Sequence, residues 1–486
     1  MKSFFSKFTV LKDAPRELWL VYLAYLMEIV AYGILNPVLT LWLSSDLGYS
    51  DAHAGYVIAL WSTLISLFTV LVGSLTDAVG IKKTFVAGFL ICIFTRAVMT
   101  VTATKWTVLT FGLLPLALGE ALMVPVMTAA VKRYSNTKQR SMAFSMYYAL
   151  MNVGFACAGW MFDHIRNVLG EHGTFVIPLL GLPISTYRSM FLVSFLAVIP
   201  GLIIIYFLRD GVEATDDGVV IESAEDPEYE EDRILAGIYK KSRETVVKTG
   251  QIFKEVCGHP TFYRFLVFLT LVVGVRLIFY HMHYTFPKYG LRELGEGAPI
   301  GRLFGMLNPV LIVILVPIAG ALTQKISAYK MITVGSFISA FSVFFMAMPP
   351  QWFAGLAESW FGSLIVHTWL GVQGPINPLY MGITMSVIVL SIGETIWSPR
   401  LYEYTAAIAP KGQEASYMAF SILPYFLAKF FVGSLSGLLL QHYCPAEGAR
   451  HSQQMWFVIG SMTMLTPLGL VVLRKYIQVK ESGREC

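Results

Sequence analysis

The chain has 486 residues, of which 56% are hydrophobic and 14% are charged, with a formal net charge of +5. Soluble domains contain about 25% charged residues, so this composition excludes an ordinary soluble protein. The basic residues form short clusters between apolar stretches, which excludes a nucleic-acid-binding face. The five cysteines show no paired spacing, and so neither a disulfide framework nor a metal site is indicated.

Twelve stretches are apolar and long enough to cross a bilayer, which takes about 20 residues per helix. Lys and Arg are concentrated in both tails and in alternate connections, so the positive-inside rule predicts that both termini are cytoplasmic. We therefore predict an all-α membrane protein whose twelve transmembrane helices form two six-helix, pseudo-symmetric halves. The expected helices are 18–44, 54–76, 84–104, 106–131, 141–162, 187–208, 262–287, 303–324, 330–349, 380–407, 414–440 and 455–474.

Two connections are long. Residues 209–261 separate the N-terminal bundle, 1–208, from the C-terminal bundle, 262–486. This cytoplasmic linker has an acidic stretch followed by an amphipathic helix, interpreted as a solvated surface helix or as a regulatory or lipid-contacting one. The second connection, 350–379, is rich in Trp and faces outward. A thirteenth span there would break the charge pattern, so we expect an interfacial or re-entrant segment.

A glycine-containing loop follows the second expected helix. Residues 73–83 read Gly-Ser-Leu-Thr-Asp-Ala-Val-Gly-Ile-Lys-Lys, and glycine lets a chain turn tightly between helices. The segment resembles the signature loop of the major facilitator superfamily, Gly-x-Leu-x-Asp-x-x-Gly-x-Lys-Lys. The resemblance implies the fold of that superfamily, with halves that rock and a gating role for Asp77. The simpler interpretation is an ordinary polar turn.

Charged side chains occur inside several expected spans. A charge at mid-membrane costs at least about 2.5 kcal/mol, so each one is a functional candidate. Glu28, Glu120 and Glu394 lie in helices one, four and ten. Burial favours the protonated form of a carboxyl group, whereas a nearby cation favours the ionised form. A carboxylate that loses its cation in one state therefore takes up a proton, and we predict that these three residues act in proton coupling.

Helix one carries a polar stripe at the helical period. Tyr25, Glu28, Tyr32 and Asn36 share one face, which we expect to line a substrate-binding cavity. The alternative for Glu28 is a structural hydrogen bond to a neighbouring helix. Arg96 in helix three is expected to snorkel or to pair with another group.

Further polar residues share faces of helices in the second half. Arg400 and Glu403 lie nearer the cytoplasmic end of helix ten. We predict that they act in gating, and the alternative is a structural pair. The residues predicted to bind substrate in these helices are Arg276, Tyr280 and His283 in helix seven, Trp397 and Ser398 in helix ten, and Lys429 in helix eleven.

Several segments resemble the proton-dependent oligopeptide transporter family. The segments are 393–399, Gly-Glu-Thr-Ile-Trp-Ser-Pro, 307–309, Leu-Asn-Pro, and 144–154, Phe-Ser-Met-Tyr-Tyr-Ala-Leu-Met-Asn-Val-Gly. The resemblance implies that Glu394 binds the amino terminus of a peptide or takes part in proton coupling. It also implies that Asn152 and Asn308 hydrogen-bond the peptide backbone and that Tyr32 and Tyr148 line the pocket.

The first half departs from this family. Its helix-one signature has two glutamates, an adjacent arginine and paired tyrosines, whereas this chain has Glu28-Ile-Val-Ala-Tyr32-Gly33. The family's helix-four lysine before proline is replaced by Val124. Those cations are implicated in binding the substrate carboxylate and in gating. Arg276 or Lys429 is the candidate for supplying the missing positive charge.

These observations predict a secondary active transporter. The leading hypothesis is proton-coupled symport of short peptides or peptide-like organic anions by alternating access, and the alternative is uncoupled or efflux transport of an amphipathic organic ion. We expect no enzymatic activity, because no nucleophile–base pair, metal-spaced ligand set or phosphate loop occurs in the sequence. The expected partners are a small-molecule substrate, protons and the lipid bilayer, with no cofactor, no metal and no nucleic acid. We expect a monomer in the cell (inner) membrane.

Overall fold

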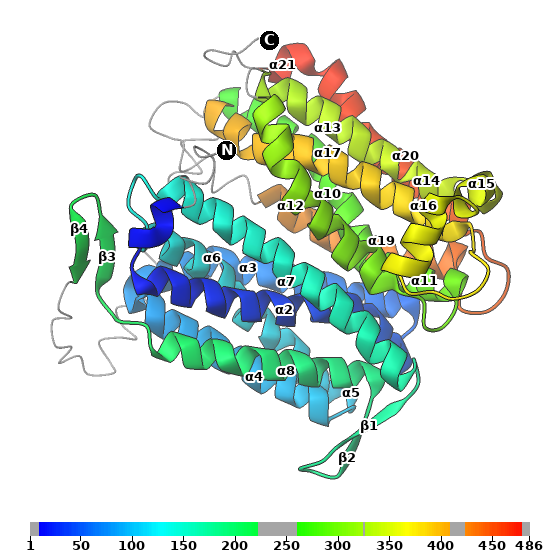
Figure 1. The fold of residues 1–486 in the computed structure, drawn as a ribbon, viewed down its shortest axis with the longest axis horizontal. Coiled ribbons are helices and arrows are strands. Elements are labelled where there is room, and N and C mark those ends of the chain that lie inside the picture. The colour runs from blue at the N-terminus through cyan, green and yellow to red at the C-terminus, as the bar shows by residue number, and fades with distance from the viewer. Residues whose placement is uncertain (1–8, 222–259, 324–325, 409–422, 479–486) are drawn as a thin grey trace. The chain divides into compact units, whose positions relative to one another are not determined.

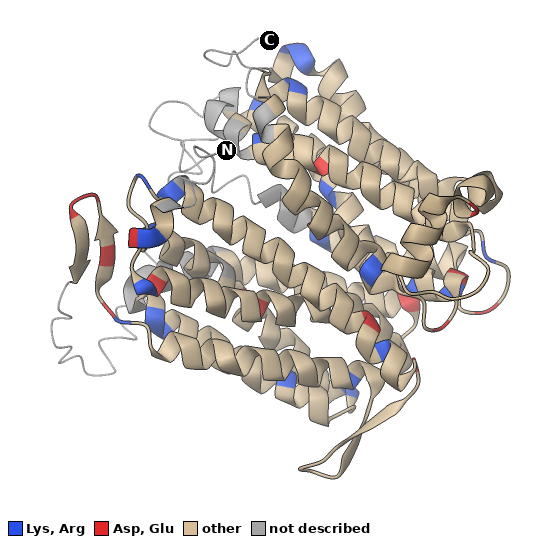
Figure 2. Cartoon of the chain, in the orientation of Figure 1, with Lys and Arg blue, Asp and Glu red and all other residues tan. Residues whose placement is uncertain are grey.

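Helices make up most of the computed structural model, which describes residues 9–221, 260–323, 326–408 and 423–478 (Figure 1). Lys, Arg, Asp and Glu lie mainly near helix ends, and most of each long helix carries none of them (Figure 2). The helices up to residue 206 are η1 (Thr9–Asp13), α2 (Arg16–Ser45), α3 (Asp51–Val79), α4 (Ile81–Val101), α5 (Lys105–Thr107), η2 (Val108–Leu113), α6 (Leu114–Arg133), α7 (Arg140–Leu169) and α8 (Thr186–Tyr206).

The long helices from residue 260 onward are joined by shorter ones. The main helices with their immediate extensions are α10 (Pro260–Tyr284), α11 (Phe286–Leu294), η3 (Gly301–Met306), α12 (Leu307–Leu322), α13 (Ala328–Ser342), α14 (Phe344–Ala347), α17 (Leu379–Ile408), α19 (Leu423–Tyr443), α20 (Ser452–Val472) and α21 (Arg474–Ile477). The short helices between α14 and α17 are η4 (Pro350–Phe353), α15 (Ala354–Ala357), α16 (Trp360–Ser363) and η5 (Leu364–Trp369).

The predicted spans coincide with helices over the described part of the chain, mostly to within a few residues, whereas α7 continues past the predicted end at 162 to Leu169. Ten helices of the described residues are long and apolar enough to cross a membrane. A helix is the natural form for such segments because it satisfies its own backbone hydrogen bonds in lipid. The protein is therefore an integral, multi-pass, mainly helical membrane protein. The count of twelve spans and the cytoplasmic position of both termini remain predictions.

The connection at 350–379 contains only short helices among its described residues, none longer than the six residues of η5. A spanning helix needs about 20 residues, so these turns are too short to cross a bilayer. Trp352 and Trp360 are 72% and 78% exposed. Exposed Trp is typical of the membrane–water interface, which supports the expected interfacial segment without testing its depth.

Two β-hairpins were not expected from the sequence. Strand β1 (Thr174–Ile177) pairs antiparallel with β2 (Leu182–Ser185), and β3 (Val212–Thr215) pairs antiparallel with β4 (Gly218–Ile221). The second hairpin opens the predicted linker and is held at the end of α6, because Arg133 Nε donates to the Val212 carbonyl at 3.1 Å. The amphipathic helix predicted further along the linker lies outside the described residues.

The chain packs as two compact units. The first unit comprises Met1–Leu35, Leu64–Ala158 and Thr174–Gln251, and the second comprises Asn36–Thr63, Gly159–Gly173 and Ile252–Cys486. In the first unit α4 packs against α6 and α8, and in the second α17 packs against α12 and α13 while α10 packs against α19 and α20. The predicted division into bundles 1–208 and 262–486 stays a prediction.

Candidate functional site

Three charged side chains meet inside the first unit. Arg96 of α4 donates from Nη2 to Glu28 Oε1 of α2 at 3.0 Å and to Glu120 Oε1 of α6 at 2.6 Å. Its Nη1 lies 3.4 Å from Glu28 Oε2. The exposed fractions of Arg96, Glu28 and Glu120 are 0%, 3% and 5%. The stripe residue Glu28 therefore faces a neighbouring helix, which is the alternative that the sequence left open.

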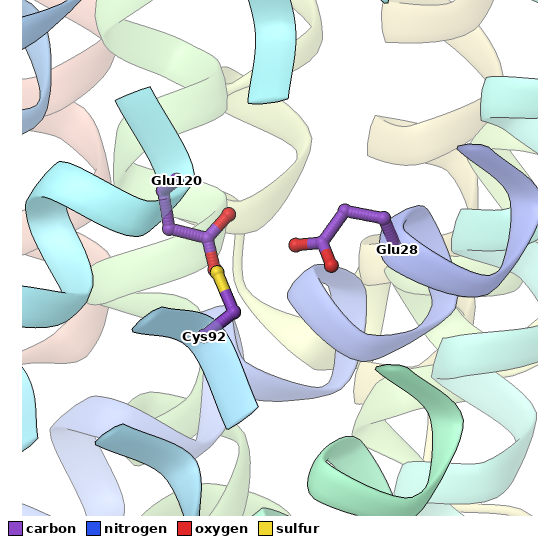
Figure 3. Close-up of side chains that lie close together, drawn as sticks. All are labelled: Glu28, Cys92 and Glu120. Atoms are coloured by element: carbon purple, nitrogen blue, oxygen red, sulfur yellow. The ribbon is translucent and has the colours of Figure 1, made fainter. Parts of the chain in front are cut away.

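Small residues bring the helices of this cluster together. A Cβ atom added at Gly119 of α6 would lie 2.7 Å from Cys92 Sγ of α4, and one added at Gly88 would lie 2.9 Å from Met123 Sδ. Glycine at membrane-helix contacts lets backbones approach closely. The approach places the carboxylate of Glu120 beside the side chain of Cys92, with the carboxylate of Glu28 pointing toward both (Figure 3).

The charges of this cluster do not cancel. Glu28 and Glu120 carry two negative charges when ionised, and Arg96 supplies one positive charge. Removal of an uncompensated charge from water is costly, so one bound proton or cation would stabilise the cluster. Potential ligand atoms of Glu28, Cys92 and Glu120 lie within 4.8 Å of one another. The Arg96 guanidinium already binds both carboxylates, and its positive charge would repel a metal ion, so the arrangement favours a proton.

The remaining predicted residues of α2 contact α7 or lie in the other unit. Tyr25 stacks on Tyr147, with ring centroids 4.2 Å apart, and Tyr32 makes an edge contact with Phe155 at 6.4 Å. Asn36 is buried and belongs to the second unit. The predicted stripe is thus divided between packing contacts and the charged cluster.

The predicted pocket residues of α7 contact each other along their own helix. Asn152 Nδ2 donates to the carbonyl oxygen of Tyr148 at 2.9 Å. Asn152 is buried, whereas Tyr148 is half-buried. The amide oxygen of Asn152 could accept a hydrogen bond from a peptide N–H group. The role of Asn152 in substrate binding stays a prediction.

Glu394 is the buried carboxylate of the second unit. Asn308 Nδ2 of α12 donates to Glu394 Oε2 of α17 at 3.1 Å and lies 3.0 Å from Ser391 Oγ. Glu394 is 8% exposed and Asn308 is 7% exposed. The two residues that the sequence placed in one substrate site are therefore adjacent, and the amide of Asn308 orients the carboxylate.

Arg276 and Trp397 lie next to this pair. The guanidinium carbon of Arg276 on α10 is 4.9 Å from the centroid of the Trp397 ring, and Arg276 interacts electrostatically with Glu394. Trp397 is fully buried and donates from Nε1 to Ser339 Oγ at 3.2 Å. Trp397 thus supports Arg276 from within the helix bundle, and Ser398 is also buried.

Lys429 of α19 lies over an aromatic ring of α10. Its Nζ is 6.0 Å from the centroid of Tyr280, which in turn stacks against Tyr284 at 6.4 Å. His283 bonds the Phe279 carbonyl through Nδ1 at 2.7 Å. Tyr280 and Lys429 are therefore adjacent in the second unit.

Two ionic contacts that the sequence did not predict lie within the second unit. Asp51, at the start of α3, pairs with Lys288 at 2.7 Å and with Arg292 at 2.8 Å, both on α11. Burial lowers the pKa of Lys288, and the charge of Asp51 opposes this effect.

The second contact joins α7 to η3. Asp163 accepts from the backbone N–H groups of Gly301 at 2.8 Å and Arg302 at 2.7 Å. Arg166 pairs with Asp163 at 3.2 Å and also with Glu171. A carboxylate at the first turn of a helix binds its unpaired N–H groups and its dipole favourably.

Glycines allow close helix crossings beside both ionic contacts. A Cβ atom at Gly55 of α3 would lie 2.6 Å from the Gly433 carbonyl oxygen of α19. A Cβ atom at Gly159 of α7 would lie 2.8 Å from the Gly301 carbonyl oxygen of η3. These crossings and ion pairs hold the segments 36–63 and 159–173 within the second unit.

The predicted gating residues are described in part. The side chains of Asp77 and Glu403 lie outside the described residues. Arg400 donates to the carbonyl and hydroxyl oxygens of Thr323 at 3.1 and 3.2 Å. Arg400 thus links α17 to the end of α12, and its predicted pairing with Glu403 stays untested.

Sequence reasoning underestimated Arg96 and missed Asp51, Lys288, Arg292 and Asp163. For Arg96 a signal was available, because a cation in the middle of one span needs a partner and two neighbouring spans each carry a mid-helix glutamate. The four others lie near the ends of expected helices, where charged residues are common and the sequence alone does not indicate their partners.

The fold and its buried charges define a multi-pass membrane transporter. A model of the Major Facilitator Superfamily matches residues 21–398, and the chain belongs to this superfamily. Dipeptide and tripeptide permease A of Proteus mirabilis (strain HI4320) is 29% identical over 143 residues, which are 29% of this chain and 29% of the permease. The resemblance to the proton-dependent oligopeptide transporter family is confirmed.

Solved transporter structures share the fold. A POT family transporter in complex with 5-aminolevulinic acid has a TM-score of 0.66 at 15% identity, over 96% of this chain and 97% of that chain. The peptide transporter POT in complex with sulfate has a TM-score of 0.68 at 15% identity, over 97% and 98%. Tetrameric PepTSo2 has a TM-score of 0.61 at 17% identity, over 95% and 96%.

Proposed function

We propose that the protein is a proton-coupled symporter of short peptides or peptide-like organic anions that works by alternating access. The matched superfamily, the partial identity to a dipeptide and tripeptide permease and the fold shared with POT family transporters support this proposal. The observation that carries the coupling is the buried cluster in which one guanidinium, that of Arg96, binds the carboxylates of Glu28 and Glu120.

The cluster suits a proton because its charge depends on one protonation event. With one proton on Glu28 or Glu120 the three side chains are neutral in total, and without it they carry one negative charge. A neutral cluster is the stable form in a medium of low dielectric constant. Movement of Arg96 away from either carboxylate would favour protonation of that carboxylate, so a conformational change of α4 would be linked to proton uptake or release.

Glu394 and Asn308 are the proposed substrate contacts. Glu394 is held by Asn308 at 3.1 Å and lies in the segment that resembles the peptide transporters. Its carboxylate would bind the amino terminus of a peptide through a charge-assisted hydrogen bond. Tyr280, His283 and Ser398 would complete the site on the second unit, and Tyr25, Tyr32, Tyr148 and Asn152 would contact substrate on the first.

Alternating access requires contacts that break and form again. We assign this role on the outer side to the bonds of Asp51 with Lys288 and Arg292, and to the bonds of Asp163 with the start of η3. Asp77, Arg400 and Glu403 are proposed to act on the cytoplasmic side. We further propose twelve spans with both termini in the cytoplasm and a monomer in the inner membrane, although tetrameric PepTSo2 shares the fold.

Uptake into proteoliposomes tests the function. An acid-outside pH gradient should drive accumulation of a radiolabelled dipeptide or tripeptide, and a protonophore should abolish it. Counterflow that ignores pH would favour the uncoupled alternative. A purified, correctly folded protein that accumulates no member of a dipeptide and tripeptide panel under the gradient would contradict the proposal.

A further inference from the structure

The mid-helix charged residues sum to a net negative charge in the first unit and to a net positive charge in the second. In the first unit, Glu28 and Glu120 outnumber Arg96 by one negative charge. In the second unit, the described mid-helix groups Arg276 and Lys429 outnumber Glu394 by one positive charge. A buried charge needs a partner or a ligand. The first unit therefore suits a cation, such as a proton, and the second suits an anion.

The two cations of the second unit have different surroundings. Arg276 lies over the Trp397 ring at 4.9 Å and interacts with Glu394, so its charge is compensated. Lys429 has no carboxylate within 4.0 Å among the described residues, and its described contact is the Tyr280 ring at 6.0 Å. The excess positive charge of the second unit therefore resides at Lys429.

The contact with Tyr280 leaves the ammonium group of Lys429 able to donate hydrogen bonds. A cation–π contact attracts the charge through the ring face and uses none of the three N–H donors. Lys429 is half-buried, so part of the residue is exposed. An anionic group at Lys429 would provide the missing charge and accept these bonds.

We propose that Lys429 binds the carboxylate of the substrate, which makes a free carboxylate a requirement for tight binding. This inference rests on the proposed transport function and specifies its substrate class. Glu394 would bind the amino end, so both charged ends of a peptide would be held by the second unit. The proton would bind separately, at the cluster of Arg96 in the first unit. The carboxylate would compensate the charge of Lys429, and one bound proton would compensate the excess negative charge of the first unit.

Uptake of a dipeptide and of its C-terminally amidated form, measured in proteoliposomes, tests the assignment. For the unmodified protein, the KM of the amide should exceed that of the acid about tenfold or more, as expected when a charge-assisted bond is lost. Lys429→Gln should raise the KM of the acid by about the same factor and leave that of the amide unchanged. Lys429→Arg should retain the preference for the acid.

Arg264→Gln is the matched control. Like Lys429, Arg264 belongs to the second unit and lies over an aromatic ring, that of Tyr476 at 5.5 Å, but it is near the start of another helix, α10. The control should leave the ratio of the two KM values unchanged. A Lys429→Gln protein that elutes as a single folded species and still prefers the acid would overturn the inference. Failure of the unmodified protein to transport any peptide would instead overturn the proposed function.

Discussion

Arg96 and Glu120 form a 2.6 Å contact between α4 and α6, and both side chains are buried. Arg96 also binds Glu28 of α2, so three helices depend on one guanidinium. Protonation of Glu28 or Glu120 should therefore change the packing of α2, α4 and α6 against one another.

Glu120→Gln should uncouple transport from the proton gradient. The substitution keeps the shape of the side chain and removes one negative charge, so the cluster becomes neutral without a bound proton. Gradient-driven accumulation should fall at least about tenfold, while counterflow of labelled against unlabelled peptide at equal pH should persist. Cys92→Ala is the control, because Cys92 is buried beside the cluster and is absent from its ion pairs. Normal accumulation by Glu120→Gln would contradict the assignment.

Arg96→Met should destabilise the protein by about 3–5 kcal/mol, since it leaves two buried carboxylates without their cation. Thermal unfolding in detergent, followed by tryptophan fluorescence, measures the loss. Adding Glu120→Gln to Arg96→Met should recover part of the stability, because it removes one of the unpaired charges. Strictly additive effects of the two substitutions would show that Arg96 and Glu120 do not interact.

Glu394→Gln should weaken peptide binding about tenfold or more and should leave folding intact. The amide can still bond Asn308 but has lost the negative charge that attracts an amino terminus. Binding of a dipeptide and of the same dipeptide with an acetylated amino terminus, measured by thermal shift, separates this role from a structural one. The substitution should reduce the stabilisation by the free dipeptide and have little effect with the acetylated one. Equal losses for both ligands would argue against recognition of the amino terminus.

Gly55→Ala should prevent the close crossing of α3 and α19. The added Cβ atom would lie 2.6 Å from the Gly433 carbonyl oxygen, which is backbone and cannot move as a side chain would. Transport should fall, and a cysteine placed at Ser62, which is 1% exposed, should react faster with a membrane-impermeant maleimide added outside. Gly355→Ala is the control, since no atom lies within 4 Å of its added Cβ. An unchanged labelling rate would show that the crossing of Gly55 and Gly433 does not help to close the outer side.

Alkaline pH should strengthen the contact of α3 with α11. Burial lowers the pKa of Lys288 in the closed arrangement, whereas an opened, solvated Lys288 has an ordinary pKa of about 10.4. At pH values between the lowered pKa of the closed form and the ordinary pKa, the opened form binds more protons. Raising the pH through this range therefore favours the closed form. Labelling of the cysteine at position 62, relative to a fully exposed cysteine, should slow as the pH approaches 10, an effect that Lys288→Met should remove and Lys330→Met should not. A rate that increases with pH would reverse the sign.

The sequence by itself determined the membrane-spanning character of the chain and nearly all of its long helices. Apolar length is a local property, because each span must satisfy its own backbone hydrogen bonds and exclude charge from lipid. The segments that resemble peptide transporters assigned Asn308 and Glu394 to one substrate site, and the structure adds that the two side chains are hydrogen-bonded at 3.1 Å. The short strands of the hairpins carried too few residues to be recognised.

Tertiary structure decided which charge has which partner. Arg96 and Glu28 are 68 positions apart in the chain, and Lys288 and Asp51 are 237 apart, so no local pattern connects them. Their pairing depends on which helix faces pack together. Close packing of these faces needs glycine at contacts such as that of Gly119 with Cys92, where a Cβ atom would not fit. Because a buried charge is stable only beside its partner, helix packing decides that Glu28, Arg96 and Glu120 form one cluster and that Lys429 has no carboxylate partner among the described residues.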